Sequence, residues 1–535
     1  MASSSVKIVD DATLKEAEME VTAVLVHLKQ LLRVKNRHRS PLLRLPTEII
    51  IHILSFVMED MGSYPAWRPI FTTCYCIRGI MTDATALWWK VDISLGREAK
   101  FALMRSQGNP RTVVARFTPW DEWEMAGRES VLVNWRDQWV LQGRRLHSLV
   151  FYGTPSSLPR FCWIFKTSLP CLDRLKFHVV SGVHDDIVSG PVALQLPTNT
   201  PLRVLDLHNA TLPWSSDLFT GLRELHLDFS DVTVSITEDE LLRILDGSPQ
   251  LERLSLVQVR QTIPVNGDQR LLPKHVVQLP VLNSLKLDND PKVVGFTMAH
   301  VHTPALVSLE IHSRISDWDV ARSLDHFFPD NRLQRRLFSD PPVFEVGRPY
   351  HYGGTPPLEF SIGSFKVRFD INADDAEAHH NATAACVRLV PPSVTTLKLE
   401  MAKLDGQQWK EFFRSHPEIQ SIECTDFRGE PMPDSFWGAL SPTEDDGWVT
   451  LCPKLDSIVC KVYTDTDQLT SLLVCLLHRE YAGFKLRHLK IVDSGKRIYR
   501  IAEIIRPLIE VLEVDFPSQL KQKVSSTSLD RPGIR

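Results

Sequence analysis

The feature that most constrains this chain is a short apolar phrase that recurs along most of its length. The phrase has the form L-x-x-L-x-L, with an apolar residue at each of its three fixed places. It begins at positions 146, 172, 202, 222, 251, 282 and 306, and again at 394, 419, 455, 486 and 509. Successive starts within each run are therefore 20 to 36 residues apart. Alternating apolar residues are typical of a strand with one buried side, so the recurrence predicts a stack of similar strand-containing units.

The segments between the phrases predict one helix for each unit. In residues 237–247, Thr237 and Glu240 have the spacing of a capping box, and Gly247 marks the helix end. Residues 407–414 and 467–478 have helical patterns at the same place within their units. The fold class expected from one strand and one helix per unit is α/β.

The spacing of the phrases lies around the leucine-rich repeat period of about 20–29 residues. We therefore expect residues 98–516 to form a curved, leucine-rich-repeat-like strand–helix solenoid. The second leucine of each phrase is expected to point into its core, at Leu205, Leu225, Leu254, Leu285 and Leu309.

Residues 315–392 interrupt this pattern. They contain Pro341-Pro342 and Gly353-Gly354, and an alternating segment at 358–371 that predicts a strand. Two interpretations stay open: a degenerate pair of units with a long loop, or an insertion over one face of the stack. Beyond the last phrase, residues 517–535 are expected to be a flexible tail.

A helical module is predicted before the repeats, at residues 41–97. Leu45-Pro46 marks a helix entry, because proline fits the first helical turn, and Glu48 favours the positive end of the helix dipole. Apolar residues then fall at positions 45, 49, 53, 56 and 57, with others at 50, 51 and 54. A helix that is apolar over most of its circumference needs a second surface to cover it.

The order of these features resembles the F-box, a short helical module that docks on the Skp-type adaptor of cullin–RING ubiquitin ligases. Members typically open on Leu-Pro-x-Glu-Ile, carry a cysteine and a tryptophan in the middle, and close on Leu-Trp. Residues that match this order are Leu45, Pro46, Glu48, Ile49, Cys74, Leu87 and Trp88, whereas Ile77 stands where the central tryptophan is usual. With its repeats, the chain looks like the F-box proteins with diverged leucine-rich repeats that are abundant in mushroom-forming fungi.

The resemblance implies an adaptor-binding surface on this module. Its expected residues are Leu45, Pro46, Glu48, Ile49, Ile53, Leu54, Phe56, Cys74, Ile77, Leu87 and Trp88. A plainer interpretation stays open, in which residues 41–97 are an amphipathic helical pair that belongs to a larger core.

Residues 1–40 are expected to form a short tail and an amphipathic, coiled-coil-like helix. Apolar residues at positions 14, 17, 21, 24, 28 and 31 alternate at spacings of three and four, as in a coiled-coil seam. Three outcomes stay open for this helix: self-association, folding back on residues 41–97, and local packing.

Composition narrows the classes of function. The chain has 535 residues, a formal net charge of −4 and 24% charged residues, which disfavours a general nucleic-acid binder. No apolar run reaches the roughly 18 residues that a membrane helix needs. The N-terminus lacks the basic-then-apolar build of a signal peptide. Nine scattered cysteines, an odd number, favour a reducing compartment, so we expect the protein in the cytosol or nucleus.

Catalytic and metal-binding signatures are missing from the sequence. It contains no H-E-x-x-H, no G-x-S-x-G and no paired C-x-x-C motif. His379, His380 and Cys386 could ligate a metal but have no evident fourth ligand. We therefore expect neither an enzyme nor a cofactor.

Three hypotheses for function remain. The first is a substrate receptor of a cullin–RING (SCF-type) ubiquitin ligase, which binds the Skp-type adaptor and, through it, the cullin scaffold, and holds a protein target on the repeats. The second is an adaptor-bound or free leucine-rich-repeat interaction protein without a ligase role. The third is an enzyme whose motif the sequence does not reveal. Neither nucleic acid nor a membrane is expected as a partner.

The expected target surface is the exposed side of the predicted sheet. In each phrase the residues flanking the second and third leucines point away from the core. These residues are Arg174, Lys176, His178, Asp206, His208, Glu224, His226, Asp228, Arg253, Lys286, Asp288, Glu310 and His312. Their mixed charge suits a polar protein epitope, and an ordinary solvated sheet face explains the same residues.

Overall fold

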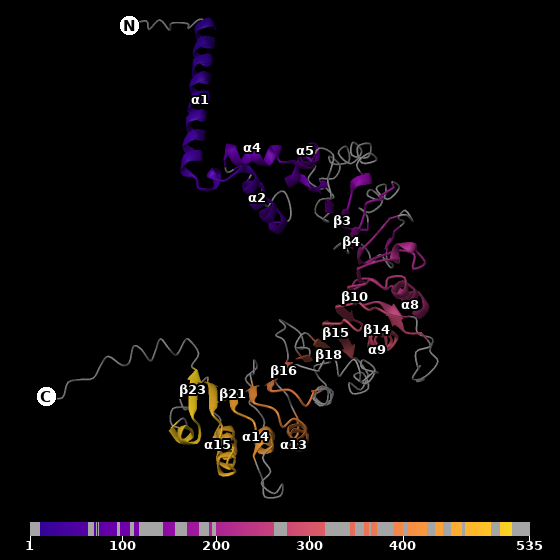
Figure 1. The fold of residues 1–535 in the computed structure, drawn as a ribbon, viewed down its shortest axis with the longest axis vertical. Helices are drawn as coiled ribbons and strands as arrows, with labels where there is room; N and C mark the ends of the chain where they lie inside the picture. The colour runs from indigo at the N-terminus through magenta and orange to yellow at the C-terminus, as the bar shows by residue number, and fades with distance from the viewer. Residues whose placement is uncertain are drawn as a thin grey trace, which may run out of the picture. The chain divides into compact units, whose positions relative to one another are not determined.

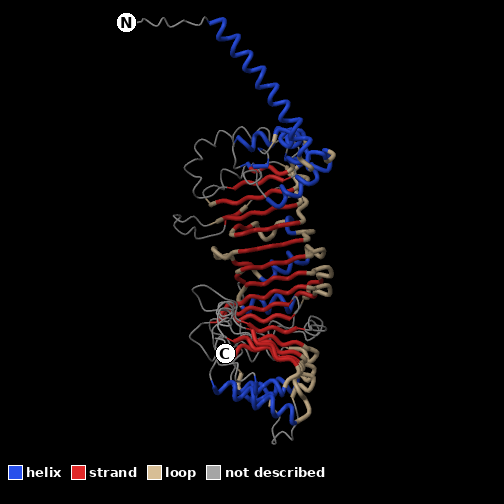
Figure 2. Tube along the Cα trace, turned by 90° about the vertical axis from the view of Figure 1, so that its left-hand side faces the viewer, coloured by secondary structure: helices blue, strands red, loops and turns tan. Residues whose placement is uncertain are grey.

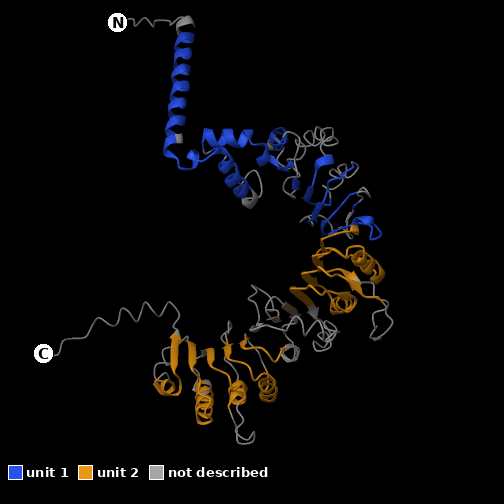
Figure 3. Ribbon diagram, viewed as in Figure 1, with its two compact units in different colours: residues 1–218 blue, residues 219–535 orange. Residues whose placement is uncertain are grey.

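The computed structural model describes residues 11–515 apart from internal gaps. The gaps are residues 62–68, 71, 73, 94–96, 107–111, 117–142, 156–167, 181–191, 195–199, 262–274, 316–342, 348–357, 363–364, 372–389, 400–403, 425–433, 442–450, 463–465 and 494–502. The tail expected at 517–535 lies outside the described residues. The chain divides into two compact units, residues 1–218 and 219–535 (Figure 3).

Unit 1, residues 1–218, begins with helices (Figure 1). They are α1 (Asp11–Arg39), η1 (Leu42–Arg44), α2 (Thr47–Met61), α4 (Tyr75–Asp83), η2 (Thr85–Trp88), α5 (Arg97–Arg105) and, later, η5 (Gly143–Arg145). The carbonyl of Pro46 accepts hydrogen bonds from the amides of Ile49 and Ile50, both at 3.1 Å. The helix entry predicted at Leu45-Pro46 is therefore present. No helix among the described residues is both long and apolar enough to cross a bilayer.

A parallel sheet completes unit 1. Its strands, paired in this order, are β1 (Lys90–Asp92), β2 (Thr112–Arg116), β3 (Ser148–Gly153), β4 (Arg174–Val179) and β6 (Val204–His208). A second, two-stranded ladder joins β5 (Val192–Ala193) to β7 (Ala210–Thr211). Because β1 pairs with β2, the sheet begins inside the 41–97 segment that the sequence assigns to the helical module. Residues 41–97 and the strands that follow them up to residue 218 lie in the same compact unit.

Unit 2, residues 219–535, contains one larger sheet, whose strands run side by side (Figure 2). Its first four strands are parallel: β8 (Glu224–Asp228), β10 (Arg253–Val257), β13 (Ser284–Asp288) and β15 (Ser308–Ile315). Five more parallel strands are β19 (Thr396–Leu399), β20 (Ser421–Cys424), β21 (Ser457–Val462), β22 (His488–Asp493) and β23 (Val511–Asp515). Short two-stranded ladders join β9 (Ser235–Ile236) to β11 (Arg260–Gln261), and β12 (Val277–Gln278) to β14 (Val301–His302).

The core of each sheet is built from the leucines of the repeated phrase. In unit 2 the register aligns Leu225, Leu254, Leu285 and Leu309 on successive strands. These four side chains and Leu205 of unit 1 are 0–2% exposed, so their predicted inward orientation is confirmed. Each inward leucine is flanked by outward residues, because side chains alternate along a strand.

Helices pack on one side of the strands in unit 2 (Figure 1). They are α8 (Glu238–Asp246), α9 (Pro291–His300), α13 (Gly406–Ser415), α14 (Asp434–Leu440), α15 (Thr466–Tyr481) and η8 (Arg506–Leu508), and η7 (Asp217–Phe219) spans the unit boundary. The predicted capping box is present: the Thr237 amide donates to Glu240 Oε2 at 2.9 Å, and the Glu240 amide donates to Thr237 Oγ1 at 3.3 Å. Space at Gly247 is tight, since a Cβ there would lie 3.3 Å from the Arg243 carbonyl oxygen and 3.3 Å from Thr220 Cγ2. The architecture of both units is thus α/β with parallel strands and helices.

The interruption at 315–392 contributes strands to the plane of the unit 2 sheet. These are β16 (Val343–Gly347), β17 (Leu358–Ile362) and β18 (Phe365–Ile371). β17 is antiparallel to both of its neighbours, while β18 pairs with β15 and β16 pairs with β19. The segment predicted as one strand is therefore an antiparallel pair. The same alternation of apolar residues runs through both strands, and it concealed the reversal between them.

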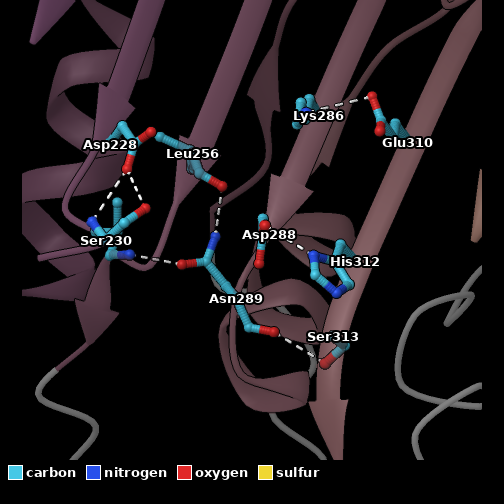
Figure 4. Close-up of polar contacts among 10 residues, drawn as sticks. Asp228, Ser230, Leu256, Lys286, Asp288, Asn289, Glu310, His312 and Ser313 are labelled. Carbon is cyan, nitrogen blue, oxygen red and sulfur yellow. Dashed lines mark hydrogen bonds and ion pairs between the residues drawn. The ribbon is translucent and has the colours of Figure 1, made fainter. Parts of the chain in front are cut away.

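Two asparagines tie neighbouring strands together where the strands end. Asn289, buried after β13, donates through Nδ2 to the Leu256 carbonyl at 2.7 Å and accepts at Oδ1 from the Val259 amide at 2.6 Å (Figure 4). Ser313 Oγ donates to the Asn289 carbonyl at 2.8 Å. Asn209 after β6 donates similarly to the Val179 carbonyl at 3.0 Å.

We predict that Asn289→Ala lowers the free energy of unfolding of unit 2 by about 1–3 kcal/mol, because it leaves a buried amide and a buried carbonyl without their partner. Hydrogen exchange measured by mass spectrometry should accelerate in the peptide that contains Val259. Asn283→Ala, at an exposed position just before the same strand, is the matched control and should leave exchange unchanged. Equal exchange rates in the two variants would show that the Asn289 side chain does not stabilise the sheet.

Candidate functional site

Helix α2 has two apolar faces. Ile50, Leu54 and Met58 are 2–7% exposed and pack into unit 1. On the other face Leu45, which precedes the helix, lies with Ile49, Ile53 and Phe56, and these four side chains are 38–60% exposed. Their spacings of four, four and three residues place them along one side of the helix. We call these four residues the α2 stripe.

The other residues predicted to bind the adaptor divide into exposed and buried groups. Pro46 and Glu48 are exposed beside the α2 stripe, and Cys74 is half-buried, with its thiol accepting the Ile77 amide at 3.3 Å to cap α4. The buried members are Leu54, Ile77, Leu87 and Trp88.

Trp88 shows what the buried group does. Its indole Nε1 donates to the Met81 carbonyl at 2.7 Å, and its ring packs edge-on against Phe101 with centroids 5.4 Å apart. The buried residues therefore fill the core that holds the α2 stripe in place. A match to a sequence pattern cannot separate such support residues from contact residues, because both are apolar.

An exposed tyrosine within this module was not predicted to bind the adaptor. Tyr75, at the start of α4, is exposed, and the Arg33 guanidinium of α1 lies 3.4 Å from the centroid of its ring. This cation–π contact joins the C-terminal part of α1 to α4.

The predicted target residues of unit 1 lie on neighbouring strands. Lys176 Nζ is 3.2 Å from Asp206 Oδ2, and His178 Nε2 is 3.3 Å from the same oxygen. The register places His178 beside His208, and their rings stack with centroids 5.6 Å apart, whereas Arg174 is exposed at the start of β4. Tyr152 stands on the other side of His178, with centroids 4.9 Å apart. Tyr152 was not predicted as a target-binding residue. It comes directly after the copy of the phrase that begins at 146, just as His178 comes directly after the copy that begins at 172.

The predicted target residues of unit 2 form ion pairs between adjacent strands. Arg253 pairs with Glu224, Lys286 Nζ is 3.6 Å from Glu310 Oε2, and His312 Nδ1 is 2.8 Å from Asp288 Oδ2 (Figure 4). Two further predicted target residues, His226 and Asp228, are half-buried on β8. Asp228 Oδ1 accepts a hydrogen bond from the Ser230 amide at 3.0 Å.

The charges of this face extend to further strands of unit 2. Lys286, Glu310 and Lys366 are in lateral register on β13, β15 and β18, and Lys398 and Glu423 are in register on β19 and β20. Lys398 Nζ lies 3.5 Å from Glu423 Oε2. Neighbouring charges thus alternate in sign. Exposed pairs of this kind contribute only about 0–1 kcal/mol each to stability, so their alternation shapes the electrostatic pattern of the face more than it stabilises the fold.

The described cysteines of unit 2, Cys424, Cys452, Cys460 and Cys475, are buried. Burial raises the pKa of the Cys452 and Cys460 thiols to about 12 and that of Cys475 to about 11. Burial also raises the pKa of Cys424 well above its usual range. Among the residues that the structure describes, no three His, Cys, Asp or Glu side chains are grouped to hold a metal ion. His379, His380 and Cys386 lie outside the described residues.

Thiol accessibility gives a test of this assignment. At pH 8, below their raised pKa values, Cys452, Cys460 and Cys475 are protonated and shielded, so the native protein should leave them unmodified by N-ethylmaleimide. Half-buried Cys74, Cys76 and Cys171 are the internal controls and should react. Peptide mapping after quenching reads the modified positions. Rapid labelling of Cys460 in the native protein would contradict its burial.

No protein-family model matches this chain, and comparison with curated proteins finds no similar one. Two surfaces of the described chain bear on its function: the α2 stripe and the charged face of the strands.

Proposed function

We propose that this chain is an F-box protein, the substrate-recognition subunit of a cullin–RING ubiquitin ligase. The observation that carries the proposal is the α2 stripe. Four large apolar side chains are exposed along one side of a helix whose opposite face already fills a core. Contiguous exposed apolar surface on a soluble protein typically marks a site for another protein. The Leu-Pro-x-Glu-Ile sequence at this helix is the one with which F-boxes begin.

The finer fold proposed for residues 98–516 is a curved leucine-rich-repeat-like solenoid. Its support is the lateral register of the repeated leucines, the helices that alternate with strands, and the buried asparagines at strand ends. Repeat proteins of this type commonly bind partners along their sheet side. The alternating charges suit a protein epitope with its own mixed charges. They give no continuous positive field for a polyanion.

The proposed mechanism requires no catalytic residue in this chain. One end binds the Skp-type adaptor and, through it, the cullin scaffold, while the strands hold a protein target. Such a bridge acts by raising the effective concentration of target lysines near a ubiquitin-charged enzyme supplied by other subunits. The proposed compartment is the cytosol or nucleus, in keeping with the odd number of cysteines.

The adaptor part of the proposal predicts that Ile49→Asp with Phe56→Asp weakens adaptor binding by more than about 100-fold. Buried apolar anchors at an interface typically contribute on the order of 2 kcal/mol each, and two charges would also be buried. The measurement is calorimetric titration of the purified chain with a purified Skp-type adaptor. The control is Val307→Asp, an exposed apolar residue of unit 2, which should bind normally. Normal binding by the double variant, with unchanged helical circular dichroism, would contradict docking through this face.

The target part can be tested by reversing an ion pair without breaking it. Glu224→Arg with Arg253→Glu keeps the pair between β8 and β10 but inverts its polarity, and Ser284 is the next register neighbour of Arg253. We predict that the swap abolishes ubiquitination of the proteins that the wild-type chain ubiquitinates under proteasome inhibition. Adaptor binding and thermal stability should not change.

The matched control swaps Arg223 with Glu252, whose side chains are 3.4 Å apart one residue earlier on the same segments. This control should ubiquitinate the same proteins as the wild type. If both swaps retained those proteins, the charged face would not be the target surface.

The second candidate function is an adaptor-bound or free interaction protein without a ligase role. The adaptor-bound form uses the same two surfaces and differs from the first candidate in whether a cullin joins the complex, whereas the free form uses only the charged face. Co-purification of a cullin with the wild-type chain, and its loss in the Ile49/Phe56 double variant, would favour the ligase role.

A further inference from the structure

Helix α1 is a long helix whose apolar side chains are exposed. Every side chain from Leu14 to Leu32 is exposed, and the structure places no other described part of the chain over them. The exposed large apolar residues are Leu14, Met19, Val21, Val24, Leu25, Val26, Leu28, Leu31, Leu32 and Val34. At its C-terminal part α1 is held to α4 by the Arg33–Tyr75 contact. A helix of this kind needs a partner surface.

Part of this apolar surface forms a regular seam. Positions 14, 17, 21, 24, 28 and 31 alternate at spacings of three and four, as the a and d positions of a coiled coil do. The seam spans 18 residues, or about 27 Å at 1.5 Å per residue. A partner helix of the same length and the same seam would cover it.

Charge identifies the partner and its direction. Residues 11–20 contain four acidic residues and one lysine, a net charge of −3. Residues 29–39 contain five lysines and arginines and no acidic residue, a net charge of +5 with histidine neutral. Two parallel copies of α1 would place like charges side by side. Two antiparallel copies would place each acidic half against a basic half, and their helix dipoles would also oppose each other.

The antiparallel register also fits the seam. In this register, two residues face each other across the pair when their numbers sum to 45. Leu14 of one copy then faces Leu31 of the other, Ala17 faces Leu28, and Val21 faces Val24. The same three pairs occur again with the two copies exchanged. Every seam residue then has a seam partner, with the two-fold axis between residues 22 and 23. We propose that α1 pairs antiparallel with α1 of a second copy of this chain. The pairing stands independently of the adaptor. If the proposed function also holds, each assembly carries two adaptor sites and two target surfaces.

The test of association is analytical ultracentrifugation of the full-length protein over a range of concentrations. The wild-type chain should sediment as a dimer at high concentration. Val21→Glu with Leu28→Glu, which places charges in the seam, should give a monomer at every concentration. Met19→Glu with Val26→Glu is the matched control, because these exposed apolar residues lie opposite the seam, and it should remain a dimer. A wild-type monomer, a larger oligomer or a monomer that floats with anionic vesicles would overturn the proposal.

The test of direction uses Leu14→Cys with Leu31→Cys. Within one helix these positions are about 25 Å apart, so a disulfide can join them only between copies. Trypsin separates them, into peptides 8–15 and 30–33. Antiparallel pairing predicts that mild oxidation links peptide 8–15 to peptide 30–33. Links of each peptide to itself would show a parallel pair and overturn the proposed arrangement.

Charge gives a second readout of direction. Glu16→Lys, Glu18→Lys and Glu20→Lys together make the acidic half basic, so dimers should be lost in the antiparallel arrangement. Adding Lys29→Glu, Lys35→Glu and Arg39→Glu makes residues 29–39 net negative and should restore the dimers in part, and 0.5 M salt should weaken the wild-type dimer. A dimer that survives the triple change would contradict antiparallel pairing.

Discussion

The constraint on which this structure depends is the lateral register of its parallel strands. Leu225, Leu254, Leu285 and Leu309 stand in one row because each strand pairs with the next without a shift. A slip of one residue would turn every leucine outward and every charge inward. The same register brings Lys286 to Glu310 and Asp288 to His312, so the core and the polar face are set together.

Much of this arrangement can be read from the sequence, because it repeats a local pattern. The inward leucines, the Thr237–Glu240 cap and the helix entry at Pro46 each depend on residues a few positions apart. The reversal between β17 and β18 could not be predicted, since both strands of the pair have the same alternation. Asn289 was missed because its partners, Leu256 and Val259, are about 30 residues away and are bonded through their backbone.

For the candidate surfaces too, contacts between residues far apart in the chain could not be read from the sequence. The sequence marks α2 as apolar over most of its circumference but does not say which side is covered. Helices α4 and η2, which follow in the chain, contact α2, and on α2 Ile50 and Leu54 are buried while Ile49 and Phe56 are exposed. On the charged face the residues were predicted, but their pairing across strands was not. That pairing makes the face an alternating row rather than a patch of one sign.

The central claim is that the α2 stripe docks an adaptor while the charged face stays free for a target. Hydrogen exchange of the full-length chain, measured with and without a purified Skp-type adaptor, tests it most directly. The account predicts slower exchange in peptides that cover α2 and the start of α4, and unchanged exchange from β8 to β15. Protection of β8 to β15, or none on α2, would contradict it.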